Sequence, residues 1–81
     1  MDVLVRKRLS QDANDKDALF TLAALHVNAG RLDDGLGVLD RVLRLDPRYP
    51  GGWIFKAKVH RMRGEREAAA SANLMAEVMQ P

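Results

Sequence analysis

The feature of this sequence that most constrains its fold is a repetition at a spacing of 34 residues. When residues 16–47 are aligned with residues 50–81, the identical pairs are Ala23 with Ala57, His26 with His60, Gly30 with Gly64, and Pro47 with Pro81. These pairs lie at helix ends and on one helix face, where a repeated structural unit is most constrained. The spacing therefore predicts an array of similar units that stack on one another.

Hydrophobic residues recur at intervals of three and four along almost the whole chain, which is the pattern of amphipathic helices. No segment alternates with the period of a β-strand, and β-branched residues are sparse. The fold class is therefore predicted to be all-α. The expected helices cover residues near 1–11, 16–29, 33–45, 50–63 and 67–79. Because the connections are short, successive helices are expected to be antiparallel neighbours.

Glycine, proline and capping residues fall where these helices should begin and end. Gly30 and Gly64 follow periodic segments and are expected to adopt the left-handed conformation that ends a helix. Either Asn14 or Asp15 is expected to cap the second helix. Pro50 is expected in the first turn of the fourth helix, where its missing amide hydrogen costs nothing.

The repeated positions follow a fixed order of large, small and ring-bearing residues before a closing proline. Trp53, Ala57 and His60 take the first three places in the second unit. This pattern resembles the tetratricopeptide repeat, a helix–turn–helix unit of about 34 residues. The resemblance implies an α-solenoid of stacked antiparallel helical hairpins in a single domain. Its parts are the second helix of a partial repeat at 1–14, repeat one at 15–48 and repeat two at 49–81.

The resemblance also assigns the residues that pack the repeats together. These are Leu19, Leu22, Ala23, His26, Gly35, Leu39, Pro47, Trp53, Ala57, His60, Ala69 and Ala76. Small residues such as Gly35 and Ala57 would let helix backbones approach closely. Lys56 departs from the pattern, since leucine is usual there, and so does Asn73, since an aromatic residue is usual there.

The resemblance implies a non-catalytic protein-interaction module with a scaffold, assembly or adaptor role. In such arrays the first helix of each repeat lines a concave groove that takes extended or helical peptides. The groove residues expected here are Phe20, Ala24, Val27, Asn28, Ile54, Phe55, Lys58, Arg61 and Met62. Chaperone-binding members hold dicarboxylates with Lys and Asn at the places of Phe20 and Ala24, so that partner class is disfavoured.

Charge is distributed unevenly, although the chain as a whole carries only +2. Residues 48–66 hold six basic residues against Glu65, which gives them a net charge of +5. Lys58 and Arg61 lie one turn apart beside Ile54, which suits a ligand with an apolar anchor and an acidic group. A solvated basic face is the alternative. Nucleic-acid binding through this segment is disfavoured, because no stacking aromatic residues alternate with the basic ones.

No arrangement of residues predicts an enzyme, a metal site or a cofactor. Ser10 and Ser71 have no associated histidine and carboxylate. His26 and His60 occupy equivalent places in adjacent repeats but have no third ligand near them, so packing roles are expected for both. The chain contains no cysteine, which excludes disulfides and thiolate ligands.

The last expected helix is apolar on nearly all sides, and such a helix ordinarily has a neighbour. We therefore expect either a fragment of a longer repeat array or a chain that dimerises or swaps domains through this surface. Self-association through the terminal helices is the alternative function.

Targeting signals are weak. The longest strictly apolar run, Leu22–Leu25, is far shorter than a membrane span. Val3–Val5 precede Arg6–Arg8, which reverses the order of a secretory signal. Together these features favour the cytoplasm slightly, without fixing a compartment.

Overall fold

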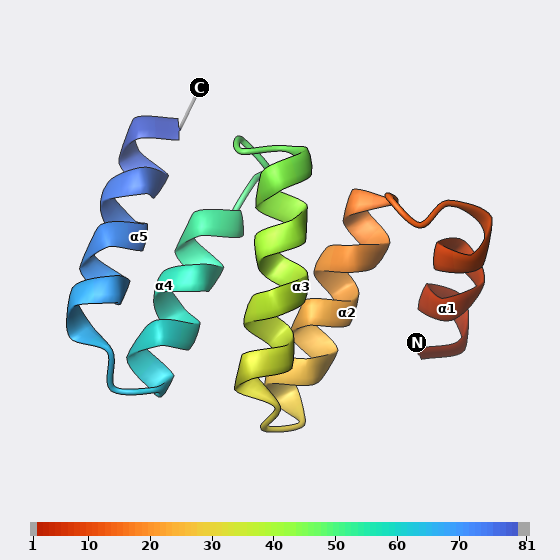
Figure 1. Ribbon diagram of the computed structural model, residues 1–81, viewed down its shortest axis with the longest axis horizontal. Coiled ribbons are helices and arrows are strands. Elements are labelled where there is room, and N and C mark those ends of the chain that lie inside the picture. Colours follow the sequence, from red (N-terminus) through yellow and green to blue (C-terminus); the bar gives the residue numbers. More distant parts are fainter. Residues whose placement is uncertain (1, 80–81) are drawn as a thin grey trace.

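The computed structural model describes residues 2–79, which form a single row of α-helices (Figure 1). The elements are α1 (Asp2–Gln11), α2 (Lys16–Asn28), α3 (Leu32–Leu45), α4 (Gly52–Met62) and α5 (Arg66–Met79). The all-α fold is confirmed, because residues 2–79 contain five helices and no strand. The helix ends differ from the expected ones by no more than two residues. The row is thin, with extents of 36 × 30 × 15 Å.

The beginning of α4 differs from the expectation. Pro50 lies in the turn before the helix, which starts only at Gly52. Gly51 between them has a φ of 77°, and this left-handed conformation is incompatible with a right-handed helical turn. Gly52 N–H donates to the Tyr49 carbonyl at 3.0 Å and closes the turn. The proline prediction was therefore wrong, because the glycine after it interrupts the helical conformation.

The other expected helix ends are confirmed. Asp15 caps α2, since its Oδ1 accepts a hydrogen bond from Ala18 N–H at 3.0 Å. Gly30 and Gly64 adopt the left-handed conformation, with φ of 82° and 77°.

Equivalent backbone hydrogen bonds close the turns after α2 and α4. Gly30 N–H donates to Val27, and 34 residues later Gly64 N–H donates to Arg61, both at 3.0 Å. The next residues in the chain, Arg31 and Glu65, each donate at 2.9 Å to the carbonyl five residues earlier, that of His26 or His60. This local recurrence is consistent with the division into repeats.

The core lies between neighbouring helices of the row. Helix α2 packs extensively against α3, α4 packs in the same way against α5, and α3 joins the two hairpins by packing on α4. Leu39 is completely buried, in a cluster with Ala23 and Leu43 that Phe20 and Trp53 cover. A second cluster consists of Val27, Leu36 and Val59. Together with the side chains that pack against it, each cluster contains residues of α2, α3 and α4, so the core connects the two hairpins.

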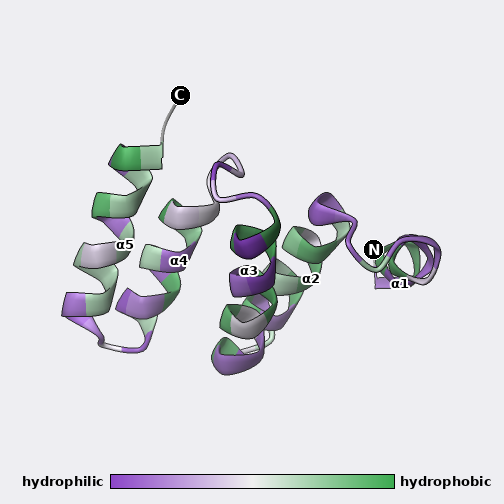
Figure 2. Cartoon of the chain, turned by 45° about the horizontal axis from the view of Figure 1, so that its top comes forward, coloured by the Kyte–Doolittle hydropathy of each residue, from purple (hydrophilic) through white to green (hydrophobic). Residues whose placement is uncertain are grey.

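Apolar side chains remain uncovered at both ends of the row. Val3 and Leu4 on α1 are exposed, as are Leu74 and Val78 on α5. Figure 2 shows hydrophobic colouring in the last turn of α5, with no further helix beside it among the described residues. Within residues 2–79, no helix reaches the length and hydrophobicity that crossing a bilayer requires.

Candidate functional site

Aromatic rings connect α2 to α4 on one face of the row. The Phe20 ring lies 5.4 Å from the Phe55 ring and 5.0 Å from the Tyr49 ring, between ring centroids. Ala24 and Asn28 follow Phe20 at steps of four, so they share its side of α2. The structure thus joins the expected groove residues of repeat one to those of repeat two through a Phe20–Phe55 contact.

The exposed strip on α4 combines apolar and basic side chains. Ile54 is 53% exposed and Met62 is 51% exposed. Lys58 lies one turn after Ile54 and is exposed, as is Arg61. A ligand on this strip would therefore meet two large apolar side chains and two cations within little more than two helical turns.

Val27 lies in the core and not in the expected groove. It is only 5% exposed and packs in the core with Leu36 and Val59. The Cγ2 methyl of Val27 also lies against Gly35 of α3. Val27 therefore stabilises the interface between repeats and has little surface for a ligand.

Ion pairs distinguish the basic residues of α4 and of the turn that follows it. Lys56 Nζ lies 2.8 Å from Asp40 Oδ1, and Arg63 lies 2.6 Å from Asp33 and 3.2 Å from Glu65. Within residues 2–79, neither Lys58 nor Arg61 forms an ion pair. The two cations on the exposed strip are thus distinct from Lys56 and Arg63, which pair with acidic side chains of the domain.

Most of the expected packing residues are buried or half-buried. Leu19, Ala23, Gly35, Leu39, Ala57 and Ala69 are buried, and Leu22, His26, Trp53, His60 and Ala76 are half-buried. Pro47 is exposed, but its carbonyl accepts a hydrogen bond from Trp53 Nε1 at 2.8 Å. It therefore orients the tryptophan through its backbone.

The two departures from the repeat pattern have physical explanations. Lys56 extends its ammonium to Asp40 of α3 and over the Trp53 ring, 5.2 Å from the ring centroid. Lys56 is half-buried, so its aliphatic stem can cover apolar surface while its charge is paired. Asn73 is exposed, because no described helix packs on that side of α5.

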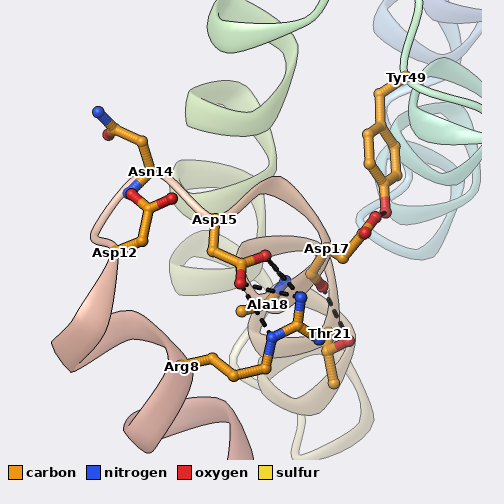
Figure 3. A network of polar contacts seen from close by, with 8 residues as sticks. All are labelled: Arg8, Asp12, Asn14, Asp15, Asp17, Ala18, Thr21 and Tyr49. Atoms are coloured by element: carbon orange, nitrogen blue, oxygen red, sulfur yellow. Dashed lines mark hydrogen bonds and ion pairs between the residues drawn. The ribbon is translucent and has the colours of Figure 1, made fainter.

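A polar network that the sequence did not predict connects α1, α2 and the turn after α3 (Figure 3). Arg8 donates through Nε and Nη2 to the two carboxylate oxygens of Asp15, both at 2.9 Å. Tyr49 Oη donates to Asp17 Oδ1 at 2.6 Å. Partial burial and the hydrogen bond to Asp17 raise the pKa of Tyr49 to about 12, and burial is the larger of the two causes. The hydrogen bond from Ala18 N–H lowers the pKa of Asp15, and Arg8 lowers it further.

The two histidines form hydrogen bonds to residues of the turns. His26 Nδ1 accepts from Arg31 Nε at 3.0 Å, and His60 Nδ1 lies 2.8 Å from Glu65 Oε1. The His60 hydrogen bond lowers the pKa of Glu65. Among the residues that the structure describes, no three histidine, aspartate or glutamate side chains lie close enough together to hold a metal ion.

The model of a known family, described as the tetratricopeptide repeat, matches residues 16–59, which is more than half of the chain. The chain belongs to the tetratricopeptide repeat family. The match covers both helices of one hairpin and most of α4, the part of the chain in which the two core clusters lie. A comparison with curated proteins found no match. Tetratricopeptide repeats are typically non-catalytic protein-interaction modules, so protein partners are indicated for this domain.

Proposed function

We propose that this tetratricopeptide repeat domain has a scaffold or adaptor role and binds an acidic segment of a partner protein on the common face of α2 and α4. The apolar part of the ligand packs on Ile54 and Met62, and its carboxylates approach Lys58 and Arg61. Phe20 and Phe55 form the floor between the two helices. No catalytic residue or cofactor takes part.

The observation that carries the proposal is the separation of paired and unpaired cations on one helix. Lys56 is held by Asp40, whereas Lys58 and Arg61 are exposed and form no ion pair within residues 2–79. An exposed cation beside an exposed apolar side chain offers a ligand both burial of apolar area and charge complementarity. A merely solvated basic face would not need Ile54 and Met62 beside the charges.

Selection from a displayed peptide library tests this proposal. The wild-type domain is expected to enrich peptides in which Asp or Glu lies next to a large apolar residue. Binding of the selected peptides should fall at least tenfold in the Lys58→Glu/Arg61→Glu variant, because two attractive pairs become repulsive. The control is Lys7→Glu/Arg44→Glu, which reverses two exposed charges on α1 and α3 and should leave binding unchanged.

Two results would contradict the proposal. One is enrichment of peptides without acidic residues; the other is equal binding by both charge-reversed variants. Binding of a labelled single-stranded or duplex oligonucleotide that falls steeply as salt rises would instead favour the nucleic-acid alternative.

Self-association through the terminal helices is a second candidate, and the exposed apolar residues favour it. Leu74 and Val78 lie one turn apart on α5 and are 61% and 63% exposed. If they mediate a dimer, the sedimentation coefficient should rise with concentration in the wild type and stay constant in Leu74→Glu/Val78→Glu. A monomer at all concentrations would exclude this candidate.

A further inference from the structure

A hollow of about 450 Å³ lies between α1 and α2, away from Lys58 and Arg61. Its lining residues are Leu4, Val5, Lys7, Arg8, Gln11, Ala18 and Thr21. Leu4 is 63% exposed, whereas Val5 beneath it is buried. Helices α1 and α2 thus present an open apolar surface at the N-terminal side of the row.

The repeat register shows what occupies the equivalent place one unit later. Moving the lining residues forward by 34 positions gives Val38, Leu39, Arg41, Val42, Leu45, Gly52 and Phe55. Of these, Val38, Leu39 and Phe55 pack in one cluster with Phe20 and Ala23 of α2. Helix α2 therefore lies over the surface that corresponds to the hollow. The surface between α1 and α2 has the form of one that receives a helix.

A pair of equivalent aspartates defines where such a helix would begin. Asp12 Oδ1 accepts from Asn14 N–H at 2.9 Å, and Asp46 Oδ1 accepts in the same way from Arg48 N–H at 3.0 Å. Asp46 also pairs through Oδ2 with Nζ of Lys16, the first residue of α2, at 3.2 Å. Figure 3 shows Asp12 beside Asn14 in the turn between α1 and α2, and within residues 2–79 Asp12 pairs with no cation.

We infer that the hollow binds one amphipathic helix of a partner protein, in the place relative to α1 that α2 takes relative to α3. The helix has a basic residue at its start, facing Asp12, and a strip of small and medium apolar residues over Leu4 and Val5. It is polar where it faces Thr21 and the Arg8–Asp15 ion pair, because these replace Phe55, Val42 and Tyr49 of the next unit.

A second copy of this chain suits the surface less well. Helix α2 presents Leu19, Ala23 and Val27, a continuous apolar strip at steps of four that its own hairpin already buries. Helix α5 exposes Leu74 and Val78, but this apolar strip is only two residues long, and the exposed Asn73 and Glu77 lie directly beside it on the helix surface. The occupant is therefore assigned to another protein.

The probe is a synthetic peptide with the sequence of residues 15–31, numbered as in the chain. It carries Asp17→Asn and Phe20→Gln, because these positions would face Asp15 and Thr21 in the hollow. Titrated into the ¹⁵N-labelled domain, the peptide is expected to shift the amide signals of α1 and of the first two turns of α2. The unmodified peptide should bind more weakly.

Two leucines of equal exposure supply the decisive variants. Leu4→Glu should weaken binding of the peptide by about tenfold or more, because a buried leucine contributes at least that factor. Leu74→Glu is the matched control on α5, where the leucine is 61% exposed compared with 63% for Leu4, and it should bind as the wild type does. The Lys58→Glu/Arg61→Glu variant should also bind normally, which keeps this test separate from that of the proposed function.

The predicted position of the bound helix is tested through the expected contact between Asp12 of the domain and Lys16 of the peptide. Asp12→Asn keeps the oxygen that accepts from Asn14 N–H but removes the charge, and should weaken binding about two- to fivefold. Lys16→Ala in the peptide should cause the same loss. The two changes combined should cost no more than either alone, as expected for partners in one contact.

Linking the peptide to the domain in one chain removes the entropic cost of bringing two separate molecules together. Joined to the N-terminus by a glycine–serine linker, the same peptide should raise the Tm of the wild type but not of Leu4→Glu. The inference is overturned if neither form shows an effect, or if the shifts centre on α5 or on the Lys58 face. Concentration-dependent shifts of α1 without peptide, abolished by Leu74→Glu, would assign the hollow to a second copy and would also overturn it.

Discussion

Two glycines of α3, only two residues apart, have opposite surroundings. A Cβ atom on Gly35 would lie 2.6 Å from Val27 Cγ2 and 3.2 Å from the Ala23 carbonyl oxygen. A Cβ atom on Gly37 would have no heavy atom of another residue within 4 Å beyond its own helix and chain neighbours. Close approach of α2 and α3 therefore requires glycine at position 35, and nothing in the structure explains the glycine at position 37.

Alanine substitutions at these positions should change stability in opposite directions. Gly37→Ala should raise the free energy of unfolding by about 0.8–1 kcal/mol, because glycine is a poor helix former. Gly35→Ala should lower it by about 1–3 kcal/mol, because the new methyl group must displace Val27 or the backbone. Urea unfolding of the two variants measures both effects, and each variant is the control for the other. Equal stabilisation by both would show that α2 and α3 do not approach so closely.

Tyr49 should make the fold sensitive to alkaline pH. The folded chain raises its pKa from 10.0 to about 12, so the neutral phenol is favoured in the folded state. The resulting stabilisation is complete below pH 10 and is lost as pH rises from 10 towards 12. Because Tyr49 is the only tyrosine, tyrosinate absorbance reports its ionisation directly. Ionisation of the folded protein near pH 10 would contradict this prediction.

The Tyr49→Phe variant is the matched control for this pH dependence. It keeps the ring packed against Phe20 but lacks the hydroxyl that donates to Asp17. Its urea midpoint should therefore decline less between pH 10 and 12 than that of the wild type.

The sequence predicted the roles of single residues at helix ends well, whereas no sequence pattern indicated the side-chain contacts between residues far apart in the chain. The Asp15 cap and the left-handed Gly30 and Gly64 follow from the preferences of single residue types at helix ends. The Asp17–Tyr49 hydrogen bond and the Asp40–Lys56 ion pair join residues far apart in sequence, and neither recurs at the repeat spacing. Only the three-dimensional packing of neighbouring hairpins brings these side chains together.

At the scale of elements, the turns after α2 and α4 share a backbone but use different side chains. In the first turn Arg31 donates to Nδ1 of His26, so that nitrogen carries a lone pair. In the second turn Glu65 accepts at the same nitrogen of His60, so that nitrogen carries the hydrogen. The same backbone turn therefore holds histidine in two different tautomers.

The neutral imidazoles of the two histidines should differ in tautomer. His26 is expected to carry its hydrogen on Nε2, and His60 on Nδ1, which long-range ¹⁵N–¹H correlation spectra distinguish at a pH where both rings are neutral. Glu65→Ala should remove the preference of His60 and leave His26 unchanged. The same tautomer at both positions in the wild type would contradict the hydrogen bonds described here.

Helical periodicity predicted each element, but not the side chains at the edge of each face. The hydrophobic positions gave five helices with ends close to the observed ones, and the error at Pro50 came from the conformation of Gly51. Val27 was expected on the groove and is buried. A helix that contacts several neighbours has faces whose limits depend on packing angles, which the spacing of residues does not encode.

On the scale of the whole molecule, stability depends on the contact between the two hairpins. In such an array each unit contacts only its neighbours, so the α3–α4 interface links the folding of one hairpin to that of the other. Leu39 lies at this interface and is fully buried, whereas Leu74 on the outer side of α5 is 61% exposed.

Truncating these two leucines should show that the α3–α4 interface contributes more to stability than the outer side of α5. Leu39→Ala should cost about 2–5 kcal/mol and lower hydrogen-exchange protection in both hairpins. Leu74→Ala should change the free energy of unfolding by no more than about 0.5 kcal/mol. Urea unfolding and amide exchange measure the two effects. Loss of protection in only one hairpin of Leu39→Ala would show that the hairpins fold independently.

The identical backbone bonding of the turns after α2 and α4 bears on how such a chain can change in length. Gly30 and Gly64 end their helices with closely similar φ and equivalent backbone hydrogen bonds, so the junctions at these two points are interchangeable. Genetic duplication or loss of a segment cut at both junctions would rejoin compatible ends. Recombination at these glycines can therefore lengthen or shorten the protein in whole units without creating a new kind of loop.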